Sequence, residues 1–91
     1  MSKMKDKTIR IKTTDDWCSN YNVDEVELSI INIGSESQPE YRVCVWGADD
    51  LGMEKDFSST ELKEAILLFE KLESEGMVSI CMLSNLGFIS T

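Results

Sequence analysis

The chain has 91 residues and a formal net charge of −8, with 42% hydrophobic and 29% charged residues. This length suits one domain with one modest core, because most domains run to roughly 100–150 residues. No stretch approaches the ~18 consecutive apolar residues of a transmembrane helix. The basic N-terminus is not followed by an apolar segment, so we expect neither a membrane span nor a signal peptide.

Charge is divided unevenly along the chain. Residues 1–12 carry five basic side chains and one acidic one, whereas residues 13–91 carry sixteen acidic and four basic ones. We predict a single α+β domain over residues 1–91, in which residues 1–7 are a basic arm that is either flexible or leads into the first strand. An anionic body repels nucleic acid and acidic membranes and attracts basic protein surfaces, many of which hold nucleic acid. The alternative is that acidity only keeps a small protein soluble.

Four segments have the period-two alternation of a half-buried β-strand. They are residues 8–14, 23–33, 41–46 and 53–57. In the second segment Ile31 and Ile33 follow on the side opposite Leu28, which predicts a bulge or a second packing surface. Residues 34–39 have the composition of a turn, and the last two segments form a hairpin around residues 47–52.

One helix is predicted directly after the hairpin. Ser58 and Glu61 have the spacing of a capping box, and Gly76 suits the C-terminal end. Between them the apolar residues recur at helical spacing: Leu62, Ala65, Ile66, Phe69 and Leu72. Residues 77–83 are predicted as a final strand, and residues 84–91 as a hairpin return or an irregular tail.

The expected fold class is therefore α+β. We predict an antiparallel sheet of four to five strands with one helix packed on one face, in the order β-β-β-β-α-β. A single helix covers one sheet face, so part of the other face should remain exposed to partners or to a second copy.

The composition argues against most catalytic sites. The chain has no histidine, no P-loop and no G-x-G-x-x-G motif, which removes the commonest general base and the commonest phosphate-binding loops. Cys44 and Cys81 fall in strand patterns and are expected as small core or sheet residues, whereas Cys18 is the thiol expected to be most exposed. Three widely spaced cysteines favour the reducing cytoplasm over a disulfide framework. We expect no enzyme and no cofactor.

Acidic and aromatic side chains are the candidates for binding. The carboxylates around the hairpin have three interpretations. They are acids of a solvated turn, or they bind a divalent metal ion, although their spacing does not match an EF-hand loop. The third interpretation is a patch that contacts Arg and Lys of a partner. Trp46 falls on the face opposite Tyr41, Val43 and Val45, which form the better core set. Tryptophan within an acidic rim is typical of a protein-binding patch. The predicted partner-binding residues are Asp49, Asp50, Glu54, Asp56, Trp46, Trp17, Asp15 and Asp16, and no metal ligand is predicted.

The junction Asp56-Phe57-Ser58-Ser59-Thr60-Glu61 resembles that of small phage anti-CRISPR proteins, where a hairpin strand ending in Asp-Phe runs into a Ser-Thr-Glu helix cap. The overall plan is also similar: a short acidic chain, an antiparallel sheet with helix cover and no catalytic set. The resemblance covers about six residues and carries no functional residue across, because such inhibitors differ widely in their contact residues. It implies a phage or mobile-element protein that acts in the host cytoplasm and docks on a nucleic-acid surface of a CRISPR effector.

Four functions follow as hypotheses. The first is a nucleic-acid-mimicking inhibitor of a nucleic-acid-handling complex, which binds a basic protein surface and neither nucleic acid nor membrane. The second is an immunity-type or adaptor protein that binds a basic partner. The third is a structural homo-oligomer, such as a homodimer, that uses the open sheet face. An enzyme acting through carboxylates or Cys18 is the least favoured.

Overall fold

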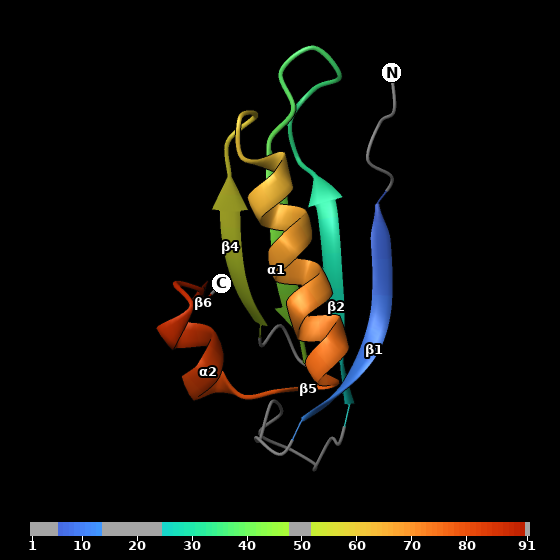
Figure 1. Ribbon diagram of the computed structural model, residues 1–91, viewed down its shortest axis with the longest axis vertical. Coiled ribbons are helices and arrows are strands. Elements are labelled where there is room, and N and C mark those ends of the chain that lie inside the picture. The colour runs from blue at the N-terminus through green and yellow to red at the C-terminus, as the bar shows by residue number, and fades with distance from the viewer. Residues whose placement is uncertain (1–5, 14–24, 48–51, 91) are drawn as a thin grey trace.

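A computed structural model describes residues 6–13, 25–47 and 52–90 (Figure 1). The strands are β1 (Lys7–Thr13), β2 (Glu25–Asn32), β3 (Tyr41–Trp46), β4 (Gly52–Phe57), β5 (Met77–Val78) and β6 (Ile89–Ser90), and the helices are α1 (Leu62–Glu75) and α2 (Ile80–Asn85). They form one sheet in the order β5-β1-β2-β3-β4-β6. The predicted α+β class is confirmed, and so is the hairpin of β3 and β4.

The sheet is mixed and six-stranded, where an antiparallel sheet of four to five strands was predicted. β1 to β4 form an antiparallel meander, as short turns favour. α1 then carries the chain back across the sheet, so that β5 runs in the direction of β1 and pairs with it in parallel. β6 pairs antiparallel with β4 at the opposite edge.

Both helices lie on the same face of the sheet (Figure 1). The core forms between them and the inward side chains of the central strands, among which Leu28, Val43 and Val45 are fully buried. Trp46 points the other way and is 37% exposed. The assignment of Tyr41 and the two valines to the core, and of Trp46 to the far face, is therefore confirmed.

β2 pairs without interruption with both neighbours, so the described strand contains no bulge. Ile31 consequently lies on the face opposite the core, and Ile33 follows it just beyond the strand, where it is 39% exposed. The predicted bulge is therefore wrong for the described strand, and the second packing surface stays a prediction.

α1 begins at Leu62 with Glu61 as its N-cap, three residues after Ser58, so the predicted capping box does not start the helix. The Glu61 carboxylate accepts a hydrogen bond of 2.8 Å from the backbone N–H of Ser58, which lowers the pKa of that carboxyl. The Ser58 hydroxyl contacts the Thr60 hydroxyl at 3.0 Å. At the other end Gly76 adopts φ 74°, and its N–H donates to the carbonyl of Leu72 at 3.1 Å. The predicted glycine stop is therefore confirmed.

The strand predicted over residues 77–83 is wrong after its first two residues. Ser79 ends β5 and caps α2, because its hydroxyl accepts a 3.0 Å hydrogen bond from the N–H of Met82. Short apolar runs fit a strand and a buried helix equally well, and here the cap decides between them. Cys81 accordingly lies on α2 and is exposed, where a core or sheet position was expected. In the C-terminal segment predicted as a hairpin return or an irregular tail, Ile89 and Ser90 form the short strand β6.

Lys7, the last residue of the predicted basic arm, lies in a strand. Lys7 already belongs to β1 and pairs with Ile30, while the Asp6 carboxylate accepts a 3.1 Å hydrogen bond from the N–H of Asn32. Neither described helix is long and apolar enough to cross a bilayer.

Candidate partner-binding face

No described helix covers the side of the sheet that faces away from α1 and α2, which we call the uncovered face. Because side chains alternate along a strand, the register identifies which residues lie there. One row across the strands contains Thr8, Ser29, Cys44, Glu54 and Ile89. Next to it lie a row with Arg10, Glu27, Trp46 and Gly52, and a row with Ile31, Arg42 and Asp56. Three of the predicted binding residues, Trp46, Glu54 and Asp56, therefore share this face.

Arg42 binds two of the predicted contact carboxylates. Its guanidinium donates to both oxygens of Asp56, at 2.7 and 3.1 Å, and forms an ion pair with Glu54. The hydrogen bonds from Arg42 hold the pKa of Asp56 below its ordinary range, and the same bonds raise the pKa of Arg42. The charges of Glu54 and Asp56 are thus partly neutralised by Arg42 of the same chain. A count of acidic residues in the sequence does not indicate this neutralisation.

Trp46 packs closely against its cross-strand neighbour Gly52. A Cβ atom at Gly52 would approach Cε3 of the indole to 2.8 Å and the carbonyl of Val45 to 3.0 Å. Only glycine therefore leaves room for the ring to rest on the hairpin. The exposed part of the indole and Ile89, which is 67% exposed, provide apolar contact area on this face.

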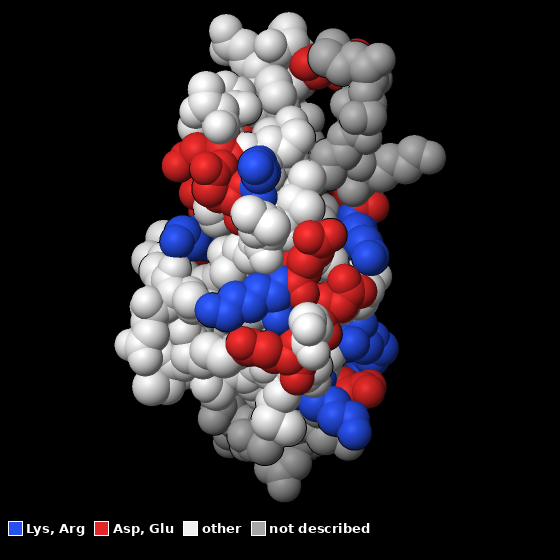
Figure 2. Space-filling view, viewed as in Figure 1, with Lys and Arg blue, Asp and Glu red and all other residues white. Residues whose placement is uncertain are grey.

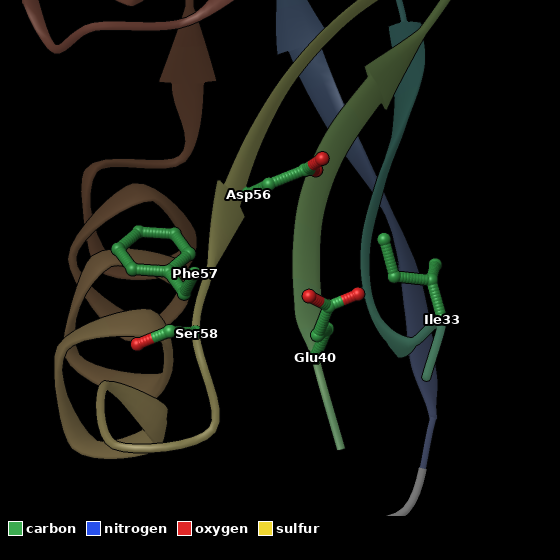
Figure 3. Close-up of a pocket in the computed structure, with 5 residues that line it drawn as sticks. All are labelled: Ile33, Glu40, Asp56, Phe57 and Ser58. Atoms are coloured by element: carbon green, nitrogen blue, oxygen red, sulfur yellow. The ribbon is translucent and has the colours of Figure 1, made fainter. Parts of the chain in front are cut away.

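A hollow of about 170 Å³ opens at the end of this face, where β2, β3 and β4 meet (Figure 3). Its lining residues are Ile33, Glu40, Asp56, Phe57 and Ser58. Figure 3 shows the carboxylates of Glu40 and Asp56 over β3 with Ile33 across from them, whereas the ring of Phe57 points toward α1. The hollow therefore combines two carboxylates with one exposed apolar side chain. The sequence reasoning missed Glu40 and Ile33, although the position of Ile33 on the polar side of its strand was a signal.

The turn that carries Ile33 and Glu40 is fixed by side-chain hydrogen bonds. The Asn32 amide oxygen accepts from the N–H groups of Gly34 and Glu40, at 2.9 and 3.2 Å. The backbone of Ile33 donates to the Glu40 carbonyl at 2.7 Å, and the Ser35 hydroxyl accepts from Gln38. The wall of the hollow is thus held in place before any ligand arrives.

The described ranges bear on two of the possible reactive centres, a buried thiol and a metal site. Cys44 is a buried sheet residue, as expected, and burial raises the pKa of its thiol, which keeps it protonated at neutral pH. Within residues 6–13, 25–47 and 52–90, no group of three or more histidine, cysteine, aspartate or glutamate side chains could hold a metal ion.

Charge on the opposite side of the molecule is mixed. Figure 2, which views the α1 side, shows acidic and basic side chains interleaved over the helix. The acidic excess of the sequence is therefore not gathered into one acidic surface on this side. Five of the predicted binding residues, Asp15, Asp16, Trp17, Asp49 and Asp50, lie outside the described residues, as does Cys18.

A scan against protein-family models finds no match to this chain, and neither does a search of curated proteins or of solved structures.

Proposed function

We propose that this protein is a non-catalytic binding protein that docks the uncovered face of its sheet on a basic surface of another protein. One observation carries the proposal. A sheet face free of described helix cover presents the Trp46 indole at one end and the hollow with Glu40 and Asp56 at the other. Aromatic anchors with charged neighbours are the usual composition of a protein-binding patch.

A nucleic-acid-handling complex is the class of partner that the charge favours. The sequence carries a net charge of −8, and basic grooves on proteins mostly serve to hold nucleic acid. Inhibition of such a complex, for example a CRISPR effector, is the function we propose for the docked protein. An immunity-type or adaptor role would use the same contacts with another basic partner.

The test is an affinity pull-down from a bacterial lysate at about 50 and about 300 mM salt, the range over which surface charge is progressively screened. Tagged wild type is compared with Trp46→Ala and with the control Leu67→Ala, which removes an exposed apolar side chain from α1 on the opposite layer. We expect recovery of a nucleic-acid-binding protein that falls with salt. Trp46→Ala should weaken its affinity by about tenfold or more, as for a binding hot spot, and Leu67→Ala should not.

Equal recovery by both variants, or binding that does not respond to salt, would contradict the proposal. Circular dichroism and urea unfolding confirm beforehand that each variant is folded. Reversing the charges of Glu54 and Asp56 would be a poorer test, because it would leave Arg42 without its partners and would add like charges beside it.

A homo-oligomer is the second candidate. The exposed Ile89 and Trp46 on one uncovered face favour it, since exposed apolar area is also what a self-associating surface needs. Sedimentation velocity over a hundredfold range of concentration separates the two candidates. A monomer throughout removes the second, and a Trp46-dependent dimer removes the first.

A further inference from the structure

We infer that the hollow lined by Ile33, Glu40 and Asp56 is a socket for one arginine side chain of the partner protein. The inference rests on the proposed function and names the chemistry that this end of the uncovered face would recognise. It comes from the size of the hollow, from its charge and from its single exposed apolar wall.

The size limits the occupant. The hollow measures about 170 Å³. Sites for cofactors and drug-sized ligands usually measure about 300–1,000 Å³. The hollow is therefore too small for such a ligand and suits one long side chain.

The negative charge around the hollow favours a cationic occupant. Glu40 is exposed, and in the described part of the chain no hydrogen-bond or ion-pair partner occupies its carboxylate. Asp56 accepts two bonds from Arg42, and an ionised carboxylate has acceptor capacity for about four. Together Glu40, Glu54 and Asp56 outnumber the guanidinium of Arg42, so the surroundings stay negative and an incoming basic group would be attracted.

The combination of groups favours arginine over lysine. The free carboxylate of Glu40 can accept the two parallel N–H groups of a planar guanidinium, which an ammonium cannot offer. Guanidinium is also the more weakly hydrated cation, so it packs more readily against the exposed side chain of Ile33. Because the turn from Asn32 to Glu40 is already fixed by its own hydrogen bonds, little ordering cost opposes binding.

The test is an NMR titration of ¹⁵N-labelled protein with the capped tripeptide acetyl-Gly-Arg-Gly-amide and with its Lys and Gln analogues. The arginine peptide should shift the amide signals of Ile33, Glu40 and Ser58, and it should bind more tightly than the lysine peptide. Glu40→Gln should raise the dissociation constant of the arginine peptide about fivefold, the size expected for the loss of one charge-assisted hydrogen bond at a partly exposed site. Glu70→Gln, which removes the same charge from α1, should leave it unchanged within about twofold.

The inference would be overturned if Glu40→Gln and Glu70→Gln weakened the binding of the arginine peptide equally, or if chemical-shift changes also appeared at acidic residues elsewhere. The peptide would then be attracted by the net charge of the protein alone. Equal affinity for the lysine peptide would overturn the assignment to arginine. Failure of the arginine socket can be distinguished from failure of the proposed function. A partner captured by wild type and by Glu40→Gln with equal affinity removes the socket and leaves the binding face, whereas failure to capture a basic partner removes the function itself.

Discussion

At the scale of single residues, the chemistry of the uncovered face depends on where Arg42 lies. The hairpin brings Arg42, Glu54 and Asp56 to one side of the sheet, but the sequence pattern cannot say which acid meets the guanidinium. That choice is set by strand register, which depends on the geometry of the hairpin loop. Glu54 and Asp56 could therefore be predicted as strand residues of the hairpin, whereas their partial neutralisation by Arg42 could not.

Asp56→Asn should destabilise the protein at pH 7 and have little effect in acid. The folded-state pKa of Asp56 is lowered from its usual value of 3.8 by the hydrogen bonds from Arg42, so the stability from this pair is present above that value and is lost as the pH falls through the lowered pKa. Half-exposed pairs contribute about 0.5 kcal/mol. Urea unfolding at pH 7 and at about pH 2.5 measures the difference.

Glu70→Gln is the control for this experiment, because it removes an acidic side chain from the exposed surface of α1. A difference between wild type and Asp56→Asn that is as large in acid as at neutral pH would mean that the contribution of Asp56 does not depend on its charge.

At the scale of secondary structure, the sequence predicted an element boundary correctly where the backbone conformation at that position favours one residue type. Gly76 was predicted to end α1, and it does so with φ 74°, a value that residues with a Cβ rarely adopt. The start of α2 was missed because Ser79 lies within an apolar run that also fits a strand. Its role as a cap becomes visible only when Val78 and Leu83 are both found in the core.

Gly76→Ala should lower the free energy of unfolding by about 1 kcal/mol. No atom lies within 4 Å of the added Cβ, so the cost is conformational and involves no clash. Asparagine tolerates the left-handed conformation better than alanine, so Gly76→Asn should cost less. Urea unfolding of the three proteins gives the comparison, and equal stability of Gly76→Ala and wild type would show that the helix ends without needing this conformation.

At the scale of the whole molecule, the fold class and the packing of a helix on one sheet face could be predicted, while the sheet's edges could not. Pairing of β5 with β1 and of β6 with β4 involves two residues on each short strand. Such short strands carry almost no periodic signal, and only the path of α1 and α2 brings them to opposite edges. The acidic composition likewise gave the net charge but not its distribution, which is interleaved over α1 (Figure 2).

The net charge itself should make stability depend on salt. With a formal charge of −8, the folded chain repels itself, and this repulsion is screened as the Debye length shrinks from about 30 Å at 0.01 M to about 8 Å at 0.15 M. The urea midpoint should therefore rise between these two salt concentrations. A triple variant of exposed helix residues, Glu64→Gln, Glu70→Gln and Glu75→Gln, should show a smaller rise. A midpoint that falls with salt would show that surface ion pairs outweigh the repulsion.

The placement of β5 and β6 has a consequence for folding. The two strands lie within the same short C-terminal segment, and each covers part of one outer edge of the sheet, β5 beside β1 and β6 beside β4. Both pairings close long loops, which is entropically costly, and α2 links the two strands along the chain. The two edges are therefore coupled: detachment of this segment would unpair both at once and would expose two templates for strand addition by other chains.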